Sequence, residues 1–372
     1  MNKEELKKRT IVHVSPYYPP HIGGLERVAK TSAEGLEKLG YKVQVVTSSK
    51  SGLKSGTKKN GNLKVTTLKS FEFAHTPIAP TFFWYLLWLP KNSLIHLHLS
   101  QAYYPELILL LFKIRRIPYI AHFHLDVGPS GFFGSLFLIY KKLCWEPILR
   151  NAKMVIACSS DQAAIVQTKY NVAKEKVIVI PNFVGQDFFS KSAYVAATDK
   201  LRLLYVGRIA IQKRIERLIN AVAAISVPVQ LTIVGDGEEL PKLKELAKKL
   251  KLENVFFEGR KNDQEMQVYH QNSDLFLISS DREGGTPLVA LEAMAAGLPI
   301  VGTDVTGVRE LLQGVGILVE EPYAENFSKV IEDLWKKPAE LNSLSLKSLG
   351  KAKQYSEVDY IKRLEEVYIK LL

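Results

Sequence analysis

The chain has 372 residues, 47% of them hydrophobic and 24% charged. It is long enough for two globular domains, and its composition excludes a disordered or fibrous protein. Only two cysteines occur, which excludes a disulfide framework and a cysteine-rich metal site. The first ten residues are charged and lack an apolar segment, which predicts a cytoplasmic protein without a signal peptide.

The charge of the chain is unevenly distributed. Fifty lysines and arginines stand against 38 aspartates and glutamates, a net charge of +12. Residues 1–186 hold 25 basic and 11 acidic side chains (+14), whereas residues 187–372 hold 25 and 27 (−2). An excess confined to one half indicates that this half faces something anionic, and a membrane surface and nucleic acid are both candidates.

Short apolar strands alternate with helical segments through the first half. A helix near residues 25–39 ends at Gly40, where glycine suits a C-terminal cap. The expected strands are 10–15, 41–47, 94–99, 119–123, 154–158 and 177–180. Alternation of this kind is typical of a parallel sheet covered by helices on both faces.

The alternation stops at residues 185–200, which predicts a linker, and then resumes. The expected strands are 201–206, 231–234, 255–257, 275–278 and 300–301, and the expected helices are 214–224, 240–250, 288–296, 326–335 and 357–372. We therefore predict two doubly wound, Rossmann-like α/β domains, 1–184 and 201–355, that face each other across a cleft. Ligands of such sheets bind beyond the carboxyl ends of the strands.

Two apolar runs stand out in the basic half, Thr81–Pro90 and Gly131–Arg150. Neither reaches the roughly 18–20 apolar residues that a membrane span needs. The second run places aromatic residues beside Lys141, Lys142 and Arg150, a composition typical of an interfacial helix. For either run taken alone, a buried helix with one solvated edge is the more common explanation.

Three segments carry candidate anion-binding residues. Gly23 and Gly24 lie between the first strand and the first helix, a position that, taken alone, a flexible turn explains better than an anion site. Arg208 and Lys213 follow the first strand of the second domain, where two cations suit a diphosphate or, alternatively, form surface salt bridges.

Residues 279–301 carry the most specific pattern, which is strand, glycine loop, helix, Gly297 cap and strand. Pro287 is well placed to begin the helix, whose free N–H groups attract an anion. Glu292 lies among apolar neighbours one turn inside this helix, and Glu283 lies on the preceding loop. A carboxylate there can accept hydrogen bonds from two vicinal ribose hydroxyls.

These segments resemble the retaining GT-B glycosyltransferases of family four (glycosyltransferase group 1), over nearly the whole chain. Ser279–Val301 resembles the family's glutamate–glycine-loop–glutamate signature, Gly207–Lys213 its phosphate clamp, and Pro19–Glu26 its double-glycine loop. His124 matches the active-site histidine. Further matches are Ile180–Asn182, Ile233–Gly237, Phe257–Gly259 and Thr303–Glu310.

The resemblance implies a role for each matching residue, and a last helix, 356–372, that crosses back to the first domain. The implied catalytic residues are His124, Glu283, Arg208 and Lys213. The implied donor-binding residues are Arg208 and Lys213 for the diphosphate, Glu292 for the ribose, Glu283, Gly285 and Thr286 for the sugar, Pro287, Leu288 and Val289 at the helix start, Arg260 and Lys261 for the base, and Gly23 and Gly24 for phosphate and acceptor.

Three positions depart from the family pattern. Eight residues separate Glu283 from Glu292 instead of the usual seven, Arg214 replaces the glycine after Lys213, and Phe183 stands in the usual Asn-Gly-Val-Asp segment.

We predict no metal site and no cofactor. The chain has no Asp-x-Asp sequence, and the cation pair with the helix N-terminus can stabilise a leaving diphosphate. His96, His98, His122 and His124 suggest zinc, but they alternate along two strands without a cysteine or a helical HExxH.

The resemblance implies a metal-independent hexosyltransferase that moves a mannose- or glucose-type sugar from a GDP or UDP donor, with retention, to a lipid or glycan acceptor. Residues 124–131 and the basic first half favour the phosphatidylinositol mannosyltransferase-like members, peripherally bound to an anionic membrane. One alternative is a GT-B epimerase, or a transferase to a soluble acceptor. Another is a non-catalytic basic binding protein, although we expect no nucleic-acid partner because the second half is not basic.

Overall fold

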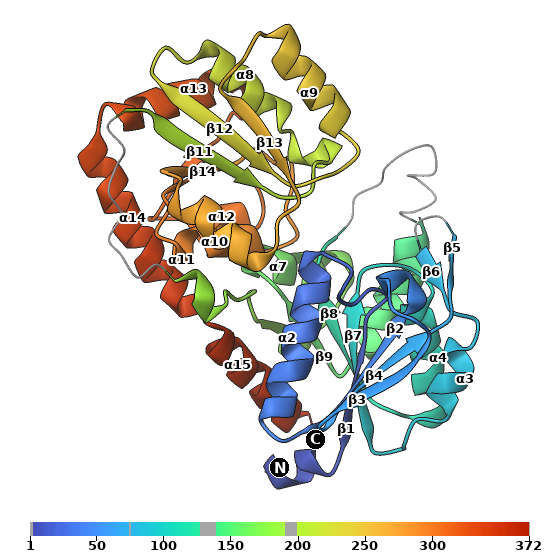
Figure 1. Cartoon of the computed structure of the whole chain (residues 1–372). Helices are drawn as coiled ribbons and strands as arrows, with labels where there is room; N and C mark the ends of the chain where they lie inside the picture. Colours follow the sequence, from blue (N-terminus) through green and yellow to red (C-terminus); the bar gives the residue numbers. More distant parts are fainter. Residues whose placement is uncertain (1–2, 74–75, 127–138, 190–198, 372) are drawn as a thin grey trace. The chain divides into compact units, whose positions relative to one another are not determined.

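The computed structural model describes residues 3–73, 76–126, 139–189 and 199–371. The chain forms two compact units, which Figure 1 shows. Unit 1 comprises Met1–Pro181 and Val358–Leu372, and unit 2 comprises Asn182–Glu357. The C-terminal segment therefore belongs to the same unit as the first half of the chain, and unit 1 gives way to unit 2 after Pro181 rather than after residue 184.

Unit 1 is built on a sheet in the order β10-β9-β8-β7-β1-β2-β4-β3. Its strands are β1 (Thr10–Val14), β2 (Lys42–Ser48), β3 (Gly56–Asn60), β4 (Leu63–Leu68), β7 (Ser93–Leu99), β8 (Tyr119–Phe123), β9 (Met154–Ala157) and β10 (Val177–Val179). Only β3 runs antiparallel to its neighbour. The hairpin β3–β4 was not predicted, because every residue of β3 is exposed and its sequence is polar.

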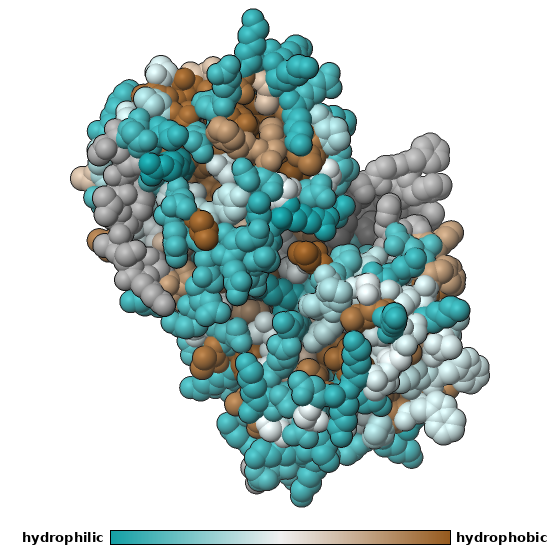
Figure 2. Space-filling view, in the orientation of Figure 1, coloured by the Kyte–Doolittle hydropathy of each residue, from teal (hydrophilic) through white to brown (hydrophobic). Residues whose placement is uncertain are grey.

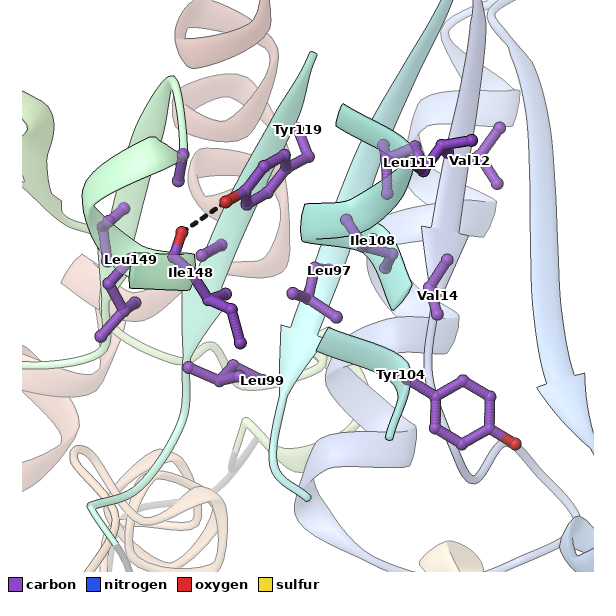
Figure 3. Close-up of a cluster of buried hydrophobic side chains, with 14 of the residues drawn as sticks. Val12, Val14, Leu97, Leu99, Tyr104, Ile108, Leu111, Tyr119, Ile148 and Leu149 are labelled. Atoms are coloured by element: carbon purple, nitrogen blue, oxygen red, sulfur yellow. Dashed lines mark hydrogen bonds between the residues drawn. The ribbon is translucent and has the colours of Figure 1, made fainter. Parts of the chain in front are cut away.

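One face of this sheet carries an apolar core that Figure 3 shows. Side chains of β1, β7 and β8 pack there against α4 (Tyr104–Arg115) and α6 (Glu146–Asn151). The hydroxyl of Tyr119 donates to the carbonyl of Ile148, the bond drawn as a dashed line in Figure 3. The remaining elements of unit 1 are α1 (Lys3–Lys7), α2 (Gly24–Lys38), α3 (Phe82–Leu87), α7 (Ser160–Lys169), α15 (Glu357–Lys370) and the small hairpin β5 (Phe71–Phe73) and β6 (Thr76–Ile78).

The C-terminal helix α15 packs within unit 1 through specific contacts. Tyr360 Oη lies 2.7 Å from Ser32 Oγ of α2, and the Tyr41 hydroxyl donates to Glu365 over 2.5 Å. A Cβ atom on Gly35 of α2 would lie 2.4 Å from the Ile361 side chain, so glycine lets the two helices approach closely. These polar and steric contacts explain why α15 belongs to unit 1.

Unit 2 contains a fully parallel sheet in the order β13-β12-β11-β14-β15-β16. Its strands are β11 (Leu201–Val206), β12 (Val229–Val234), β13 (Val255–Gly259), β14 (Leu275–Ile278), β15 (Ile300–Thr303) and β16 (Ile317–Val319). Its helices are α8 (Glu216–Ala224), α9 (Leu240–Lys249), α10 (Asp263–Gln271), α11 (Leu288–Ala295), α12 (Val308–Leu312), α13 (Ala324–Trp335) and α14 (Pro338–Ala352). The expected elements of this half are all present, and β16, α10, α12 and α14 are additional.

The predicted linker differs in the structure. Its first residues pack within unit 2, since Phe188 is buried in an apolar cluster of that unit. Val184, the residue just before the predicted linker, pairs its backbone with that of Ser356. Residues 190–198 of the predicted linker lie outside the described residues.

The predicted interfacial helix over Gly131–Arg150 needs a correction at Lys141. Residues 131–138 lie outside the described residues. Lys141 is almost fully buried and pairs with Asp126, so it cannot face an anionic surface. Burial alone would raise the pKa of Asp126, but hydrogen bonds from Lys141, Lys169 and Tyr170 outweigh it and lower that pKa.

The other apolar run, Thr81–Pro90, contains the short helix α3. Phe82 and Leu86 face the core, whereas Trp84 is 65% and Trp88 87% exposed. No helix among the described residues is long and apolar enough to cross a membrane.

Candidate active site

Two loops of unit 2 meet where the adjacent strands β11 and β14 end. The backbone N–H of Asp281 donates to the Gln212 carbonyl over 2.9 Å, and Ser279 Oγ donates to the Lys213 carbonyl over 2.8 Å. Parallel strands place their carboxyl ends at the same sheet edge. The order of the sheet therefore brings together residues that are about 70 positions apart.

Lys213 and Glu283 form a close ion pair at this edge. Nζ of Lys213 lies 2.6 and 2.7 Å from the two carboxylate oxygens of Glu283, and Ser280 Oγ donates to the same carboxylate. Both side chains are largely buried, with 18% and 11% exposed. Their charges are therefore less screened than those of a surface pair.

Helix α11 begins directly after the glycine loop. Pro287 is its N-cap residue and makes no side-chain capping hydrogen bond. The sequence predicted Pro287 in the first helical turn, but it stands one position before that turn. Glu292 lies one turn inside α11 and is only 4% exposed.

Glycine is required at two places in these loops. Gly285 has a φ of 101°, a conformation that side chains with a Cβ rarely adopt. Gly307 has a φ of 83°, and a Cβ atom there would lie 1.9 Å from the Gly285 carbonyl oxygen. The neighbouring Thr286 is buried, and its carbonyl accepts a hydrogen bond from Asn182. The loop with one extra residue is thus held by backbone contacts.

The other candidate cations of unit 2 form loose pairs at the ends of neighbouring strands. Arg208 follows β11 and lies 3.5 Å from Glu238, and Arg260 follows β13 and lies 3.4 Å from Asp236. Lys261 lies 3.6 Å from Glu258. Arg208 and Arg260 are more than half exposed, and such pairs contribute only about 0–1 kcal/mol. Both guanidinium groups can therefore exchange their carboxylate for a ligand phosphate at low cost.

The remaining candidates lie in unit 1. Gly23 is the N-cap residue of α2, and a Cβ atom there would lie 2.2 Å from the Glu26 carboxylate. Glu26 is buried and bonded to His21 over 2.7 Å, so a carboxylate already lies beside this helix start. Gly24 is the first residue of the same helix.

His124 follows β8 and joins a cluster of buried imidazoles. Its Nε2 lies 3.0 Å from Nδ1 of His98, and Gln162 holds its backbone carbonyl over 2.8 Å. Burial lowers the pKa of His124 to about 3, so the ring is neutral near pH 7. Sequence analysis did not identify His13, whose ring faces the same cluster from β1.

Comparison with known proteins agrees with this architecture. A model of the family "Glycosyltransferase Family 4" matches residues 22–188, and "Glycosyl transferases group 1" matches residues 187–351. The chain belongs to glycosyltransferase family four. Its two units are the two Rossmann-like halves of the GT-B fold.

Individual relatives of this glycosyltransferase are distant. The O-antigen biosynthesis glycosyltransferase WbnH of Escherichia coli is 32% identical over 235 residues, which cover 62% of this chain and 65% of WbnH. A relative from Arabidopsis thaliana, one of the subunits of phosphatidylinositol N-acetylglucosaminyltransferase, is 26% identical over 99% of this chain and 83% of its own length. The crystal structure of Anabaena HepE with UDP and glucose shares the fold, with a TM-score of 0.78, 18% identity and coverage of 97% and 99%.

Proposed function

We propose that this glycosyltransferase transfers a mannose- or glucose-type hexose from a UDP or GDP donor, with retention, to a lipid or glycan acceptor at a membrane surface. The observation that carries the proposal is the Lys213–Glu283 pair, in which Glu283 lies on the loop that leads into α11, whose N-cap residue Pro287 makes no capping hydrogen bond. A cation and a helix N-terminus at one place suit the diphosphate of a nucleotide sugar. UDP bound in the fold relative HepE supports this donor class.

We assign to the residues of unit 2 the roles that the resemblance to family four implies. Lys213 and Arg208 bind the diphosphate, and the backbone N–H groups of Leu288 and Val289 in the first turn of α11 donate to it. Glu292, one turn further along, accepts hydrogen bonds from the ribose hydroxyls. Glu283, Gly285 and Thr286 contact the sugar, while Arg260 and Lys261 lie beside the base.

In unit 1, Gly23 and Gly24 approach phosphate and acceptor, and His124 hydrogen-bonds the sugar. Transfer breaks the bond between the anomeric carbon and the diphosphate, and negative charge grows on the leaving oxygen. Lys213, Arg208 and the helix dipole stabilise that charge without reorganising, which is the main way in which such a site accelerates a reaction.

A panel of nucleotide sugars tests the donor. UDP-glucose, UDP-N-acetylglucosamine and GDP-mannose are added separately, and the thermal unfolding temperature is measured. The donor should raise this temperature, because a ligand that binds only the folded state stabilises it. Product analysis by NMR then shows whether an acceptor is glycosylated with the donor's anomeric configuration. An inverted linkage, or an epimerised free nucleotide sugar, contradicts the proposed reaction.

Activity should persist in excess EDTA. The chain has no Asp-x-Asp sequence, and Lys213 and Arg208 supply positive charge beside the proposed diphosphate site. Initial rates are measured with EDTA alone and after addition of excess Mg²⁺ or Mn²⁺. A rate that falls to background in EDTA and returns only with the metal ion contradicts this assignment.

Exposed aromatic residues of unit 1 support the membrane acceptor. Trp84 of α3 and the C-cap residue Trp88 lie four residues apart, the spacing of side chains on one helix face, and Phe73 of β5 is 71% exposed. On the face shown in Figure 2, hydrophilic side chains prevail and hydrophobic residues gather in separate groups. Tryptophan favours the membrane interface, and each nearby lysine or arginine adds about 1 kcal/mol at an anionic surface.

The protein should therefore sediment with anionic vesicles at low salt and be released at high salt. Replacing Trp84 and Trp88 by serine should reduce the bound fraction severalfold, whereas Leu346→Ser, at an equally exposed position of unit 2, should leave it unchanged. Equal binding to anionic and neutral vesicles, or binding to neither, would remove the membrane acceptor from the proposal.

A further inference from the structure

Five histidines occupy one face of the unit 1 sheet. His13 of β1 stands in register with His96 of β7, and His98 of β7 with His122 of β8, while His124 follows at the end of β8. His13, His96, His98 and His122 are at most 1% exposed. Since the chain has only eight histidines, this sheet face concentrates most of them.

The rings form two chains of hydrogen bonds. In the first, Nδ1 of His13 lies 3.1 Å from Nε2 of His98, and Nδ1 of His98 lies 3.0 Å from Nε2 of His124. In the second, the Tyr368 hydroxyl lies 2.5 Å from Nδ1 of His96, whose Nε2 lies 3.1 Å from Nδ1 of His122. The first chain ends at the proposed sugar contact, His124, and the second ends on α15.

A metal ion is the competing explanation of this cluster. Two triads, His13–His96–His98 and His98–His122–His124, have nitrogen atoms within 4.8 Å of one another. The rings lie nearly parallel, however, with 16° between His98 and His124 and 24° between His96 and His98. Lone pairs of parallel rings do not converge on one point, whereas the distances of 3.0–3.1 Å are ordinary hydrogen-bond lengths. The geometry therefore favours hydrogen bonding.

Each neutral imidazole has one N–H donor and one bare acceptor nitrogen, so all bonds in a chain point the same way. At one end, Nε2 of His13 is buried and has no hydrogen-bond partner among the described residues. An unpaired buried N–H group is rarer than an unpaired acceptor. His13 therefore carries its proton on Nδ1 and donates it to His98.

The contacts at the other end of the chain are compatible with this direction. Sγ of Cys158 lies 3.6 Å from Nε2 of His122 and 3.7 Å from the Phe123 carbonyl oxygen, which can only accept. When the thiol donates to this carbonyl, the sulfur is an acceptor for both rings. Nδ1 of His124 lies 4.0 Å from this sulfur. His124 therefore carries its proton on Nδ1, and its Nε2 accepts from His98.

We propose that His98, oriented by His13, is a positioning residue that fixes His124 as the Nδ1–H tautomer. The effect of this tautomer on sugar binding rests on the proposed function. The Nε2 lone pair of His124 is occupied, and its Nδ1–H is held only by a long contact to sulfur. His124 then offers a sugar hydroxyl a hydrogen-bond donor and does not act as a base.

The tautomer can be read directly from the ¹⁵N shifts of labelled histidine rings in the full-length protein, with the His124 signals assigned by their loss in His124→Gln. We expect a protonated Nδ1 and a bare Nε2. His98→Leu should abolish this preference. His98→Asn should retain it, because the asparagine Nδ2 is attached to Cγ as the histidine Nδ1 is. Tyr368→Phe, a buried change in the second chain, should leave the His124 shifts unchanged.

Activity gives a second measurement. His98→Leu should lower kcat/KM about tenfold, in the range seen when the orienting partner of an imidazole is removed, and His98→Asn should restore most of it. A proton on Nε2 of His124, an unchanged tautomer in His98→Leu, or a stoichiometric metal ion found by elemental analysis overturns the inference. If the expected tautomer is present but no nucleotide sugar is turned over, the proposed function fails while the tautomer assignment stands.

Discussion

Replacing Lys213 by alanine should weaken donor binding about 100-fold, or about 2.7 kcal/mol, while the fold survives. The variant loses a charged hydrogen bond to the diphosphate, an interaction that contributes about 1.5–3 kcal/mol. It also leaves the Glu283 carboxylate unpaired beside the proposed anion site, because Lys213 is bonded to both of its oxygens. Glu292→Ala should likewise lose donor binding, since the ribose loses its acceptor.

Calorimetric titration with the donor and circular dichroism check this expectation together. Arg202→Ala is a matched control, because Arg202 is a half-exposed cation near the amino end of the same strand, β11. The double variant Lys213→Ala/Glu283→Ala should bind nucleoside diphosphate more tightly than Lys213→Ala alone, because it removes the repulsive carboxylate. If both Lys213→Ala and Glu292→Ala keep the fold and bind the donor with unchanged affinity, the assignment of the donor site is wrong.

The elements that sequence analysis predicted are those with strong apolar runs. Strand β7 is buried throughout, and β8 likewise, so their sequences are apolar apart from Ser93 and the histidines. Sequence analysis did not predict the hairpin β3–β4 or the short strand β16, for different reasons. Strand β3 is polar and exposed at a sheet edge, where lysines discourage pairing with other chains. Strand β16 has three residues, too few for a periodic pattern.

The site residues could be predicted where the chain brings them together locally. One loop and the helical turn after it contain Gly285, Pro287 and Glu292, so their spacing can be recognised in the sequence. The ion pair between Lys213 and Glu283 could not be predicted from the sequence, because it depends on β11 lying next to β14 in the sheet. His13 was missed for the same reason, since its partner His98 lies 85 residues away.

The buried imidazoles should also make unit 1 sensitive to acid. Burial lowers the pKa of His13 and of His124 from the usual 6.5 to about 3. Burial and the neighbouring histidines lower the pKa of His96, His98 and His122 well below 6.5. The unfolded chain therefore binds more protons than the folded unit between about pH 3 and 6.5. The stabilisation is complete above pH 6.5 and is lost as the pH falls through that window.

For each such histidine, the free energy of unfolding falls by about 1.4 kcal/mol for every pH unit below 6.5. Five together approach the whole stability of a typical domain, about 5–15 kcal/mol, within one to two pH units. We therefore expect unit 1 to unfold steeply between about pH 5 and 6, far above the range in which carboxylates titrate.

Urea unfolding between pH 5 and 8 measures this slope, with tryptophan fluorescence as the signal in a Trp335→Phe background. The remaining tryptophans, Trp84, Trp88 and Trp145, then all report on unit 1. The slope should correspond to about five protons, and His13→Phe should reduce it by about one even if that variant is less stable overall. A slope below one proton would mean that these rings are already charged, or are accessible to water, in the folded unit. Either case is incompatible with a neutral hydrogen-bonded cluster, so the same titration also tests the arrangement that orients His124.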